Sequence, residues 1–449
     1  MNKFLLISYA FPPMGVVGSI RPYKVCRHLP SRGWVPIVLT SYPRQGLYLD
    51  HTLLEKIPKG VRIYRAKYIN VVQSYQKLKE KWLKGCGRQE ANERLLPMFG
   101  SEVDKEARFS FKRKLKRAFL SFFSTPDHQV FWNIAVLKTG TRILRRNSDI
   151  RLIMTTSPPH SSQMGGALLA RMFNKPYIVD FRDPWWDIAK NRYGCVRSRL
   201  EKKLESIIIR GAEFVVSSTE CYSRELAKRY GSIGKGKFIT IRNSFEPELF
   251  EQIGVRKRRK FTLCYLGILY PEYNPYVFFE ALAEWLTNDS NARENTEVLL
   301  VGTVDSVTSR VIKKLNLKDV VRILPRMSHD EAISQAKSSD MLLMLLGCDK
   351  KVPKGCVPSK LYEYLGCKRP ILALVPEGEA ANIVRQTQTG YVVSSDDKAK
   401  MKEILTREFN RKWQAKRKSE NNFEPDELEI EKYTTEHAMD QFAKLFNSI

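Results

Sequence analysis

The sequence predicts an α/β protein built from two Rossmann-like domains that face each other across a cleft. Three observations predict this fold. The chain has 449 residues, more than one hydrophobic core usually supports, so two domains of roughly 200 residues each are expected. Short apolar runs alternate with helical stretches, as parallel strands joined by crossover helices require. A content of 43% hydrophobic and 28% charged residues is typical of a chain that folds into a globular structure.

The first domain is predicted over residues 1–250. A short apolar strand at 4–8 is followed by a loop rich in Pro and Gly, a helix and a second strand at 35–39, which together form a βαβ unit. Further strands are expected at 152–154, 177–180 and 214–217. The alternation indicates a parallel, doubly wound sheet.

Residues 72–124 are basic and lack this alternation, so they are predicted to be an insertion in the first domain. Within the insertion, residues 108–123 read RFSFKRKLKRAFLSFF. Phe111, Leu115 and Phe119 fall on one face of a helix, with most of the basic side chains on the other. This pattern favours contact with an anionic membrane surface. The alternative is a helix packed on its own domain beneath a solvated basic rim.

The second domain is predicted over residues 258–425, and the polar, basic stretch at 248–260 is predicted to link the two domains. Its strands are expected at 261–265, 297–301, 320–324, 341–346 and 371–374. A last segment, residues 430–449, contains an amphipathic stretch that predicts a C-terminal helix.

The charge balance is strongly basic, with 76 Lys and Arg against 48 Asp and Glu, a net charge of +28. Such an excess attracts polyanions, which include nucleic acid, anionic lipid and phosphorylated substrates. Nucleic acid is not the expected partner, because no nucleic-acid-binding motif accompanies the charge. The eight cysteines lack CxxC spacing, so neither zinc nor a disulfide framework is expected. The sequence shows no signal-peptide pattern and no run of about 18 apolar residues, which predicts a cytoplasmic protein.

Paired Rossmann-like domains bind ligands at the carboxyl ends of their strands, so the candidate residues are sought in those loops. The loop after the first strand contains Gly15 and Gly18. Glycine there permits close backbone approach to a diphosphate or an acceptor. A tight turn explains the two glycines equally well.

Two further loops of the first domain carry polar side chains suited to catalysis. His160, in TTSPPHSS, follows a strand directly and is a candidate to bond a sugar hydroxyl or to share a proton. In DFRDPWW, Arg182 lies between Asp180 and Asp183, where a guanidinium can fix the carboxylates or grip phosphate, and tryptophan faces can stack on sugars. The alternatives are a histidine that stabilises its turn and an Arg and Asp pair that is purely structural.

In the second domain, the segment PSKLYEYL predicts the start of a helix. A proline and the hydroxyl of Ser359 mark the helix amino terminus, whose amides and dipole suit a diphosphate. Lys360 adds a positive charge, and Glu363, one turn later, can bond both hydroxyls of a ribose. The alternative is a plain amphipathic helix capped by the serine.

These segments, taken together, resemble the GT-B glycosyltransferases of the family 4 type, in the subgroup with a DFRDPW loop. The matching pieces occur in family order and span nearly the whole chain: FPPMGVVGSIRP, TTSPPHSS, VDFRDPWW, IRNSFEPELF, YLGILY and PSKLYEYLGCKRPILAL.

The resemblance implies transfer from a nucleotide-sugar, generally with retention of configuration and without a metal or other cofactor. By position, it implies that Ser359 and Lys360 face the diphosphate, Glu363 the ribose and Arg326 the base. His160, Arg182 and Asp183 would line the donor sugar and the acceptor. The last helix would cross back to the first domain.

Two departures from the family pattern bear on the donor. Many members have two glutamates eight positions apart, but the residue eight before Glu363 is Gly355. The Arg and Lys expected after the first strand of the second domain are missing, with Ile268 and Asn274 near those places. Phosphate binding would then depend on Lys360, the helix terminus and Lys350, Lys351 or Lys354.

The sequence therefore predicts a glycosyltransferase that moves a sugar to a lipid-linked glycan acceptor in surface polysaccharide biosynthesis. The basic charge and the segment at 108–123 predict a peripheral location on the inner membrane face. Two other functions fit the same resemblance. One is a GT-B-shaped sugar-nucleotide epimerase, and the other is a non-catalytic partner subunit, suggested by Gly355.

Overall fold

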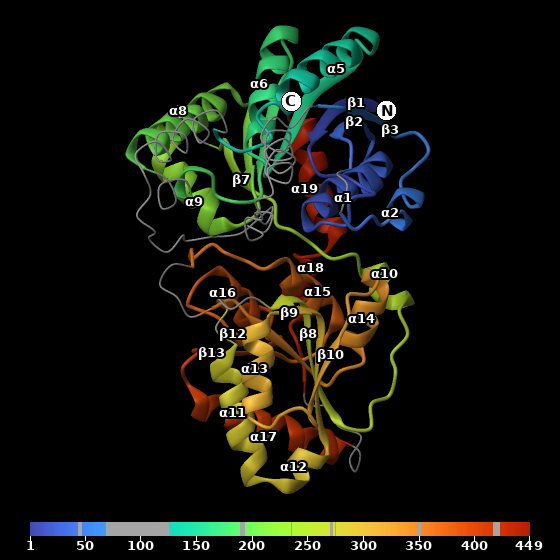
Figure 1. Ribbon diagram of the computed structural model, residues 1–449. Helices are drawn as coiled ribbons and strands as arrows, with labels where there is room; N and C mark the ends of the chain where they lie inside the picture. Colours follow the sequence, from blue (N-terminus) through green and yellow to red (C-terminus); the bar gives the residue numbers. More distant parts are fainter. Residues whose placement is uncertain are drawn as a thin grey trace, which may run out of the picture. The chain divides into compact units, whose positions relative to one another are not determined.

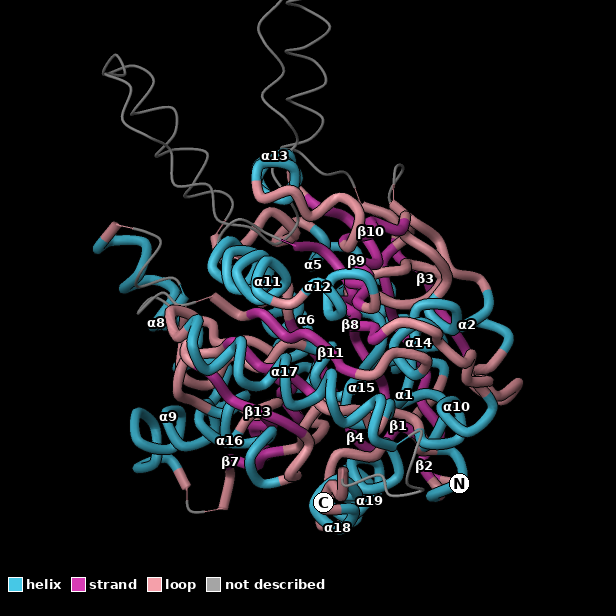
Figure 2. Tube along the Cα trace, turned by 90° about the horizontal axis from the view of Figure 1, so that it is seen from below, coloured by secondary structure: helices cyan, strands magenta, loops and turns pink. Residues whose placement is uncertain are grey.

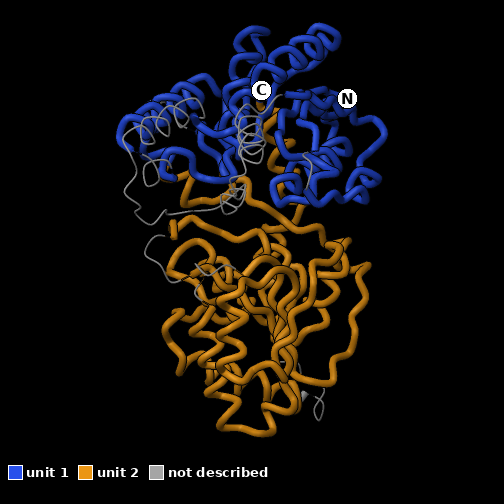
Figure 3. Tube along the Cα trace, in the orientation of Figure 1, with its two compact units in different colours: residues 1–217, 226–239, 449 blue, residues 218–225, 240–448 orange. Residues whose placement is uncertain are grey.

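The computed structural model describes residues 1–43, 47–68, 125–188, 194–234, 236–269, 273, 275–347, 352–415 and 423–449 (Figure 1). The insertion predicted at 72–124, with its helix at 108–123, lies outside the described residues. The described chain divides into two compact units (Figure 3). Unit 1 comprises residues 1–217, 226–239 and 449, and unit 2 comprises residues 218–225 and 240–448.

Unit 1 is built on a seven-stranded sheet with the order β3-β2-β1-β4-β5-β6-β7. Its strands are β1 (Asn2–Ser8), β2 (Trp34–Ser41), β3 (Arg62–Ala66), β4 (Ile150–Ser157), β5 (Tyr177–Phe181), β6 (Phe214–Ser217) and β7 (Phe238–Thr240). The pairings from β3 through β6 are parallel. The central strands read as continuous apolar runs because helices cover a parallel sheet on both faces. The strand order reverses between β1 and β4.

The helices of unit 1 connect these strands. They are the 3-10 turns η1 (Val17–Ser19), η2 (Pro30–Arg32) and η3 (Gly231–Ile233) and the α-helices α1 (Ile20–His28), α2 (Thr52–Glu55), α5 (Trp132–Arg146), α6 (Ser161–Phe173) and α8 (Cys195–Gly211). A further helix, α9 (Glu220–Tyr230), is divided between the two units.

Unit 2 contains a six-stranded sheet with the order β10-β9-β8-β11-β12-β13, in which each neighbouring pair is parallel. Its strands are β8 (Phe261–Leu269), β9 (Thr296–Val304), β10 (Val321–Leu324), β11 (Met341–Leu345), β12 (Ile371–Leu374) and β13 (Gly390–Val393). Successive residues of a strand point to opposite faces. Leu263 and Tyr265 accordingly join one hydrophobic cluster, while Cys264 and Leu266 join another.

Helices alternate with these strands along the chain (Figure 2). They are α10 (Pro247–Gln252), α11 (Tyr276–Asn288), α12 (Ser290–Glu294), α13 (Ser306–Lys314), α14 (His329–Lys337), α15 (Ser359–Cys367), α16 (Glu379–Gln386), α17 (Lys398–Ala415), α18 (Glu427–Glu431) and α19 (Thr435–Asn447). Both units therefore have the α/β architecture that the sequence predicts.

Unit 2 begins earlier in the chain than the domain boundary predicted at 258. Phe245 forms a parallel bridge with Thr434 and packs edge-on against Phe250, which places this segment in one of the hydrophobic clusters of unit 2. The last helix, α19, is also assigned to unit 2. Its return to the first domain stays a prediction.

Among the described residues, no helix combines the length and the apolar character needed to cross a bilayer.

Candidate functional site

Helix α15 begins beside the point where the strand order of the second sheet reverses. β8 and β11 are neighbours there, and the chain runs outward from them in both directions. Ligands of such sheets bind outside the carboxyl ends of the strands at this point. Pro358 is the N-cap of α15, and its own side chain forms no capping hydrogen bond. The first amides and the positive end of the helix dipole are therefore available to an anion.

Ser359 is the first helical residue of α15 and not its cap. The alternative in which its hydroxyl closes the helix end is therefore wrong. A proline at the N-cap has an extended backbone, here φ −62° and ψ 138°, and its side chain has no polar atom that could accept from the first amides. Its carbonyl oxygen accepts from the amide of Leu361 at 3.0 Å.

The side chain of Lys360 extends to the end of β8. Its Nζ atom lies 3.7 Å from the centroid of the Tyr265 ring, which is a cation–π distance. A Cβ atom on Gly267, where φ is +103°, would lie 3.7 Å from the same Nζ. Burial lowers the pKa of Lys360 to about 7, while the charge of Glu363 acts in the opposite direction. The ammonium ion thus titrates close to neutral pH.

Glu363 lies one turn further along α15 and is held by a histidine that the sequence analysis missed. Its Oε1 atom is 2.9 Å from Nε2 of His329, the first residue of α14. A capping box between Ser328 and Glu331 fixes the start of that helix. The Glu363 side chain remains 31% exposed. Its carboxylate is therefore oriented and still open to a ligand.

Two other predicted positions of unit 2 lie near these elements in the chain. Arg326 follows β10 by two residues and is exposed. Lys354 is exposed as well, whereas Lys350, Lys351 and Asn274 lie outside the described residues.

Gly355, which replaces the family's first glutamate, is packed closely. A Cβ atom at this position would lie 3.1 Å from Cβ of Cys221 and 3.3 Å from Oγ1 of Thr219. The neighbouring Glu379 accepts hydrogen bonds of 2.7 Å from the amides of Glu220 and Cys221. The start of α9 therefore fills the space that a longer side chain at position 355 would enter.

In unit 1, the guanidinium of Arg182 binds carbonyl groups. It donates to the carbonyl oxygens of Ser157 at 3.0 Å and Pro158 at 2.6 Å, and to that of Gly18. These carbonyls belong to the loops after β1 and β4, at the point where the strand order reverses. A Cβ atom on Gly18 would lie 3.3 Å from Nη1 of Arg182. A side chain at position 18 would require the end of the Arg182 side chain to shift by a few tenths of an ångström.

Asp180 forms a bidentate hydrogen-bonded ion pair with Arg21. Nε and Nη2 of Arg21 lie 3.0 and 2.8 Å from the two carboxylate oxygens, and Thr156 donates a further bond of 2.7 Å. Both charged side chains are buried. Burial lowers the pKa of Arg182, while the charges of Asp180 and Asp183 act in the opposite direction. That this guanidinium fixes the two carboxylates stays a prediction. Asp183 is exposed.

His160 is the N-cap residue of α6 and is partly buried. Its ring stacks on Trp185, with 5.1 Å between ring centroids and 4° between ring planes. Its Nδ1 lies 3.2 Å from Oγ of Ser157. Burial, and secondarily the charge of Arg182, lower the pKa of His160 to about 3. The imidazole is therefore neutral at pH 7 and can accept or share a proton in a hydrogen bond.

The expectation that both tryptophans stack on a sugar is wrong for Trp185, which is 1% exposed and donates to Glu201 at 3.1 Å. The ring of Trp186 is covered by cations, with Nζ of Lys202 at 4.6 Å and Cζ of Arg229 at 4.5 Å from its centroid. These rings hold the loop against its neighbouring helices.

Gly15 contacts the segment between β2 and α2. Its amide donates to the carbonyl of Tyr48 at 2.9 Å, and a Cβ atom at Gly15 would lie 2.4 Å from the Tyr48 ring. This contact joins two segments that are far apart in the sequence, and the tight-turn alternative stays open. A contact of Gly15 or Gly18 with a ligand stays a prediction.

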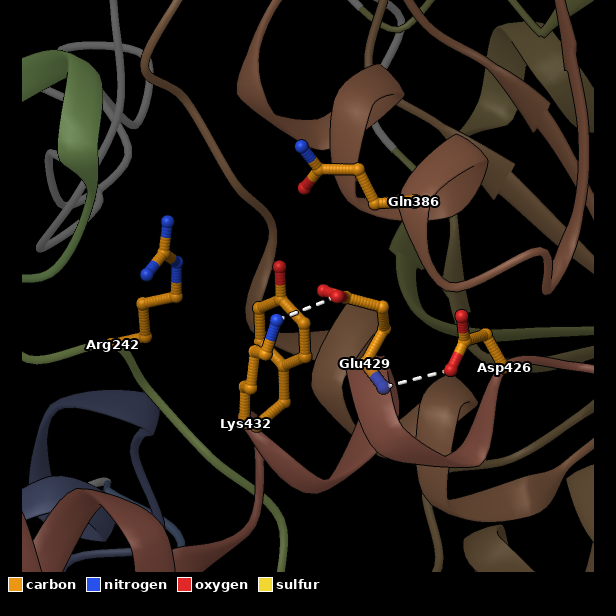
Figure 4. Close-up of a pocket in the computed structure, with 6 residues that line it drawn as sticks. Arg242, Gln386, Asp426, Glu429 and Lys432 are labelled. Carbon is orange, nitrogen blue, oxygen red and sulfur yellow. Dashed lines mark hydrogen bonds and ion pairs between the residues drawn. The ribbon is translucent and has the colours of Figure 1, made fainter.

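An open pocket in unit 2 is lined by other residues (Figure 4), which are Arg242, Gln386, Asp426, Glu429, Lys432 and Tyr433. Lys432 bonds the carboxylate of Glu429, whose amide donates to Asp426 at 3.0 Å. Much of the charge that lines the pocket is therefore paired within the lining itself. None of the predicted site residues lines this pocket.

Within the described ranges, no three His, Cys, Asp or Glu side chains are grouped so that they could hold a metal ion.

Comparison with known proteins relates these features to a family. Residues 246–424 match the family model of the glycosyl transferases group 1. A sequence search of curated proteins gave no match.

Solved structures with the GT-B fold are similar over the whole chain. HepE of Anabaena in complex with UDP is 14% identical, with a TM-score of 0.60 and coverage of 100% of both chains. Sucrose-phosphate synthase of Thermosynechococcus elongatus is 14% identical, with a TM-score of 0.62 and coverage of 100% of this chain and 99% of that chain. The UDP-GlcNAc 2-epimerase of Methanocaldococcus jannaschii is 9% identical, with a TM-score of 0.53 and coverage of 100% of both chains.

Proposed function

We propose that this chain is a sugar transferase, because residues 246–424 match the glycosyl transferases group 1 model and the fold is that of GT-B structures. The enzyme moves a sugar from a nucleotide-sugar to a lipid-linked glycan acceptor in surface polysaccharide biosynthesis, with retention of configuration. It acts at the inner face of the membrane, and neither a metal nor another cofactor is part of the proposal.

The start of α15 carries the proposal for the donor. A helix amino terminus at the strand reversal of a parallel sheet supplies backbone donors and a positive dipole for a diphosphate. Lys360 adds a cation beside it, and Glu363 adds an oriented carboxylate for the ribose. A diphosphate and a ribose joined to each other are the common part of nucleotide-sugars.

UDP is the first nucleotide to test, because HepE of Anabaena has been solved with UDP and with UDP-glucose. Arg326, exposed after β10, is proposed to contact the base.

The transfer step is proposed to use His160, Arg182 and Asp183. A neutral His160, fixed by its stacking on Trp185, suits a hydrogen bond to a sugar hydroxyl. Arg182 holds the loops that follow β1 and β4, and Asp183 lies exposed beside it. Gly15 and Gly18 are proposed to shape the acceptor side of these loops.

Thermal-shift measurements with UDP-, GDP-, ADP- and CMP-sugars test the donor site. A ligand at 100 times its dissociation constant stabilises the protein by about 2.7 kcal/mol. Lys360→Ala and Glu363→Ala should abolish the shift given by the true donor, while Lys313→Ala, a substitution of an exposed lysine in α13, should leave it unchanged. Normal donor binding by both site variants would refute the assignment.

Epimerisation is a second candidate, favoured by the similarity to the UDP-GlcNAc 2-epimerase. The two reactions differ in their need for an acceptor. An epimerase converts the sugar-nucleotide when it is supplied alone, whereas a transferase releases the nucleoside diphosphate in step with glycosylation of the acceptor. Donor binding without either reaction would indicate a non-catalytic subunit.

A further inference from the structure

Three neighbouring helices cover one face of the sheet in unit 1. The connections from β3 to β4, β4 to β5 and β5 to β6 all advance in the same direction across the sheet. Right-handed crossovers therefore place α5, α6 and α8 on the same face. α6 contacts both of the others, and a Cβ atom on Gly140 of α5 would lie 2.4 Å from Leu169 of α6. Figure 1 shows α5 and α6 alongside each other. We call the outward side of these helices the basic face.

The basic face, limited to α5, α6 and α8, exposes positive charge without negative charge. The connection from β6 to β7 places α9 on the same face of the sheet, and that helix carries the exposed Glu225. The carboxylates of the three helices are Glu201 and Glu205, and both are buried. Glu201 bonds Arg197, and Glu205 bonds Arg229. The exposed cations of these helices are Lys138, Arg142, Arg145, Arg146, Arg171, Arg199, Lys202, Lys203 and Arg210.

Large aliphatic side chains are exposed among these cations. They are Ile134, Leu168, Met172, Val196 and Ile207, each between 45% and 78% exposed. On α5, Ile134, Lys138, Arg142 and Arg145 recur at helical spacing, so the apolar and basic positions form one stripe. A face adapted only to water would have mixed charge signs and fewer exposed aliphatic groups.

We propose that the basic face of α5, α6 and α8 docks the enzyme on an anionic lipid bilayer. The cations would lie among lipid phosphates while the aliphatic side chains enter the interface between headgroups and acyl chains. Nucleic acid would use the cations but would leave the aliphatic side chains without a role. This proposal rests on the proposed function, because docking on a bilayer would bring the enzyme to a lipid-linked acceptor.

Co-sedimentation of the full chain with vesicles tests this face. Wild type should bind vesicles that contain phosphatidylglycerol and should not bind vesicles of pure phosphatidylcholine. Each basic residue near an anionic surface changes partitioning about fivefold. The triple variant K138E/R142E/R171E should therefore bind more than tenfold more weakly, and I134S/L168S/M172S should also weaken binding. The matched control, R310E/K313E/K314E on α13 of unit 2, makes the same change in net charge and should bind as wild type does.

Equal binding by wild type and the α5–α6 charge variant would overturn the proposal, as would an equal loss in the α13 control. Binding to random duplex DNA that the α5–α6 variant loses, without any vesicle binding, would overturn it in favour of nucleic acid. UDP-sugar binding measured without vesicles separates this proposal from the donor site. The affinity for a UDP-sugar should be the same in wild type and in all these variants. If wild type binds no UDP-sugar, the result counts against the proposed function but not against docking.

Discussion

His329 and Glu363 face each other across the boundary between α14 and α15, with 2.9 Å between Nε2 and Oε1. The histidine occupies one oxygen of the carboxylate that is proposed to bind the ribose. Because this contact restricts the carboxylate, we propose that His329 is a positioning residue for the donor.

Loss of this contact should reduce the discrimination between ribose and deoxyribose. In wild type, a UDP-sugar should bind more tightly than its 2′-deoxy analogue, since a hydrogen bond to a charged group is worth about 1.5–3 kcal/mol. We expect His329→Ala to shrink that difference and Glu363→Ala to remove it, as measured by calorimetric titration. His329→Asn, which keeps a donor, should restore part of it. An unchanged ratio in His329→Ala would show that the histidine has no such role.

Donor affinity should decrease as the pH rises through about 7. The pKa of Lys360 is lowered to about 7 by burial, so below that pH the side chain is a cation that attracts the diphosphate. Above that pH, Lys360 of the free protein must take up a proton before the protein binds the diphosphate equally well. A UDP-sugar suits the measurement because its diphosphate does not titrate near neutral pH. Lys360→Arg should make the affinity independent of pH between 6 and 8, and a flat profile in wild type would contradict this explanation.

The buried pair of Arg21 and Asp180 should dominate the stability of unit 1. Arg21→Met leaves a buried carboxylate without its partner, which typically costs about 3–5 kcal/mol in the free energy of unfolding. Arg385→Met removes a comparable but exposed pair with Glu377 and should cost less than about 1 kcal/mol. Chemical denaturation measures both values. Similar losses in the two variants would mean that the burial of the pair has little consequence.

Restoration of the family glutamate at Gly355 should not raise activity. A Cβ atom there already approaches Cys221 and Thr219, so the glutamate side chain has to displace the start of α9. We expect Gly355→Glu to destabilise unit 2 by about 1–3 kcal/mol, the usual cost of overpacking, and to lower transfer. Gly355→Ala should be milder. A gain in turnover by the glutamate variant would show that the space opens and that the missing carboxylate limits the enzyme.

The sequence located the central strands well and missed three at the sheet edges. β6 and β12 have the predicted bounds. β3, β7 and β13 were not predicted, and each is the last strand at an edge of its sheet. Edge strands are short and partly exposed, so the continuous apolar run that marks a buried parallel strand is weak in them.

The helix that carries the proposed donor site was predictable because its signal is local. The start of α15, with Lys360 and Glu363, lies in a single segment that carries its own helix signals. The partners of two key carboxylates were not predictable, because Arg21 is 159 residues from Asp180 and His329 is 34 residues from Glu363. Nothing in a linear pattern records such pairings, which exist only once the strands are ordered.

The salt bridge of Asp180 changes the interpretation of the DFRDPW motif. Its first carboxylate is committed to Arg21, its guanidinium to three carbonyl groups and its first tryptophan to the interior. Most of the motif therefore describes how a loop is anchored. The motif thus predicts an anchored loop more directly than it predicts a reaction, and Asp183 is its exposed residue.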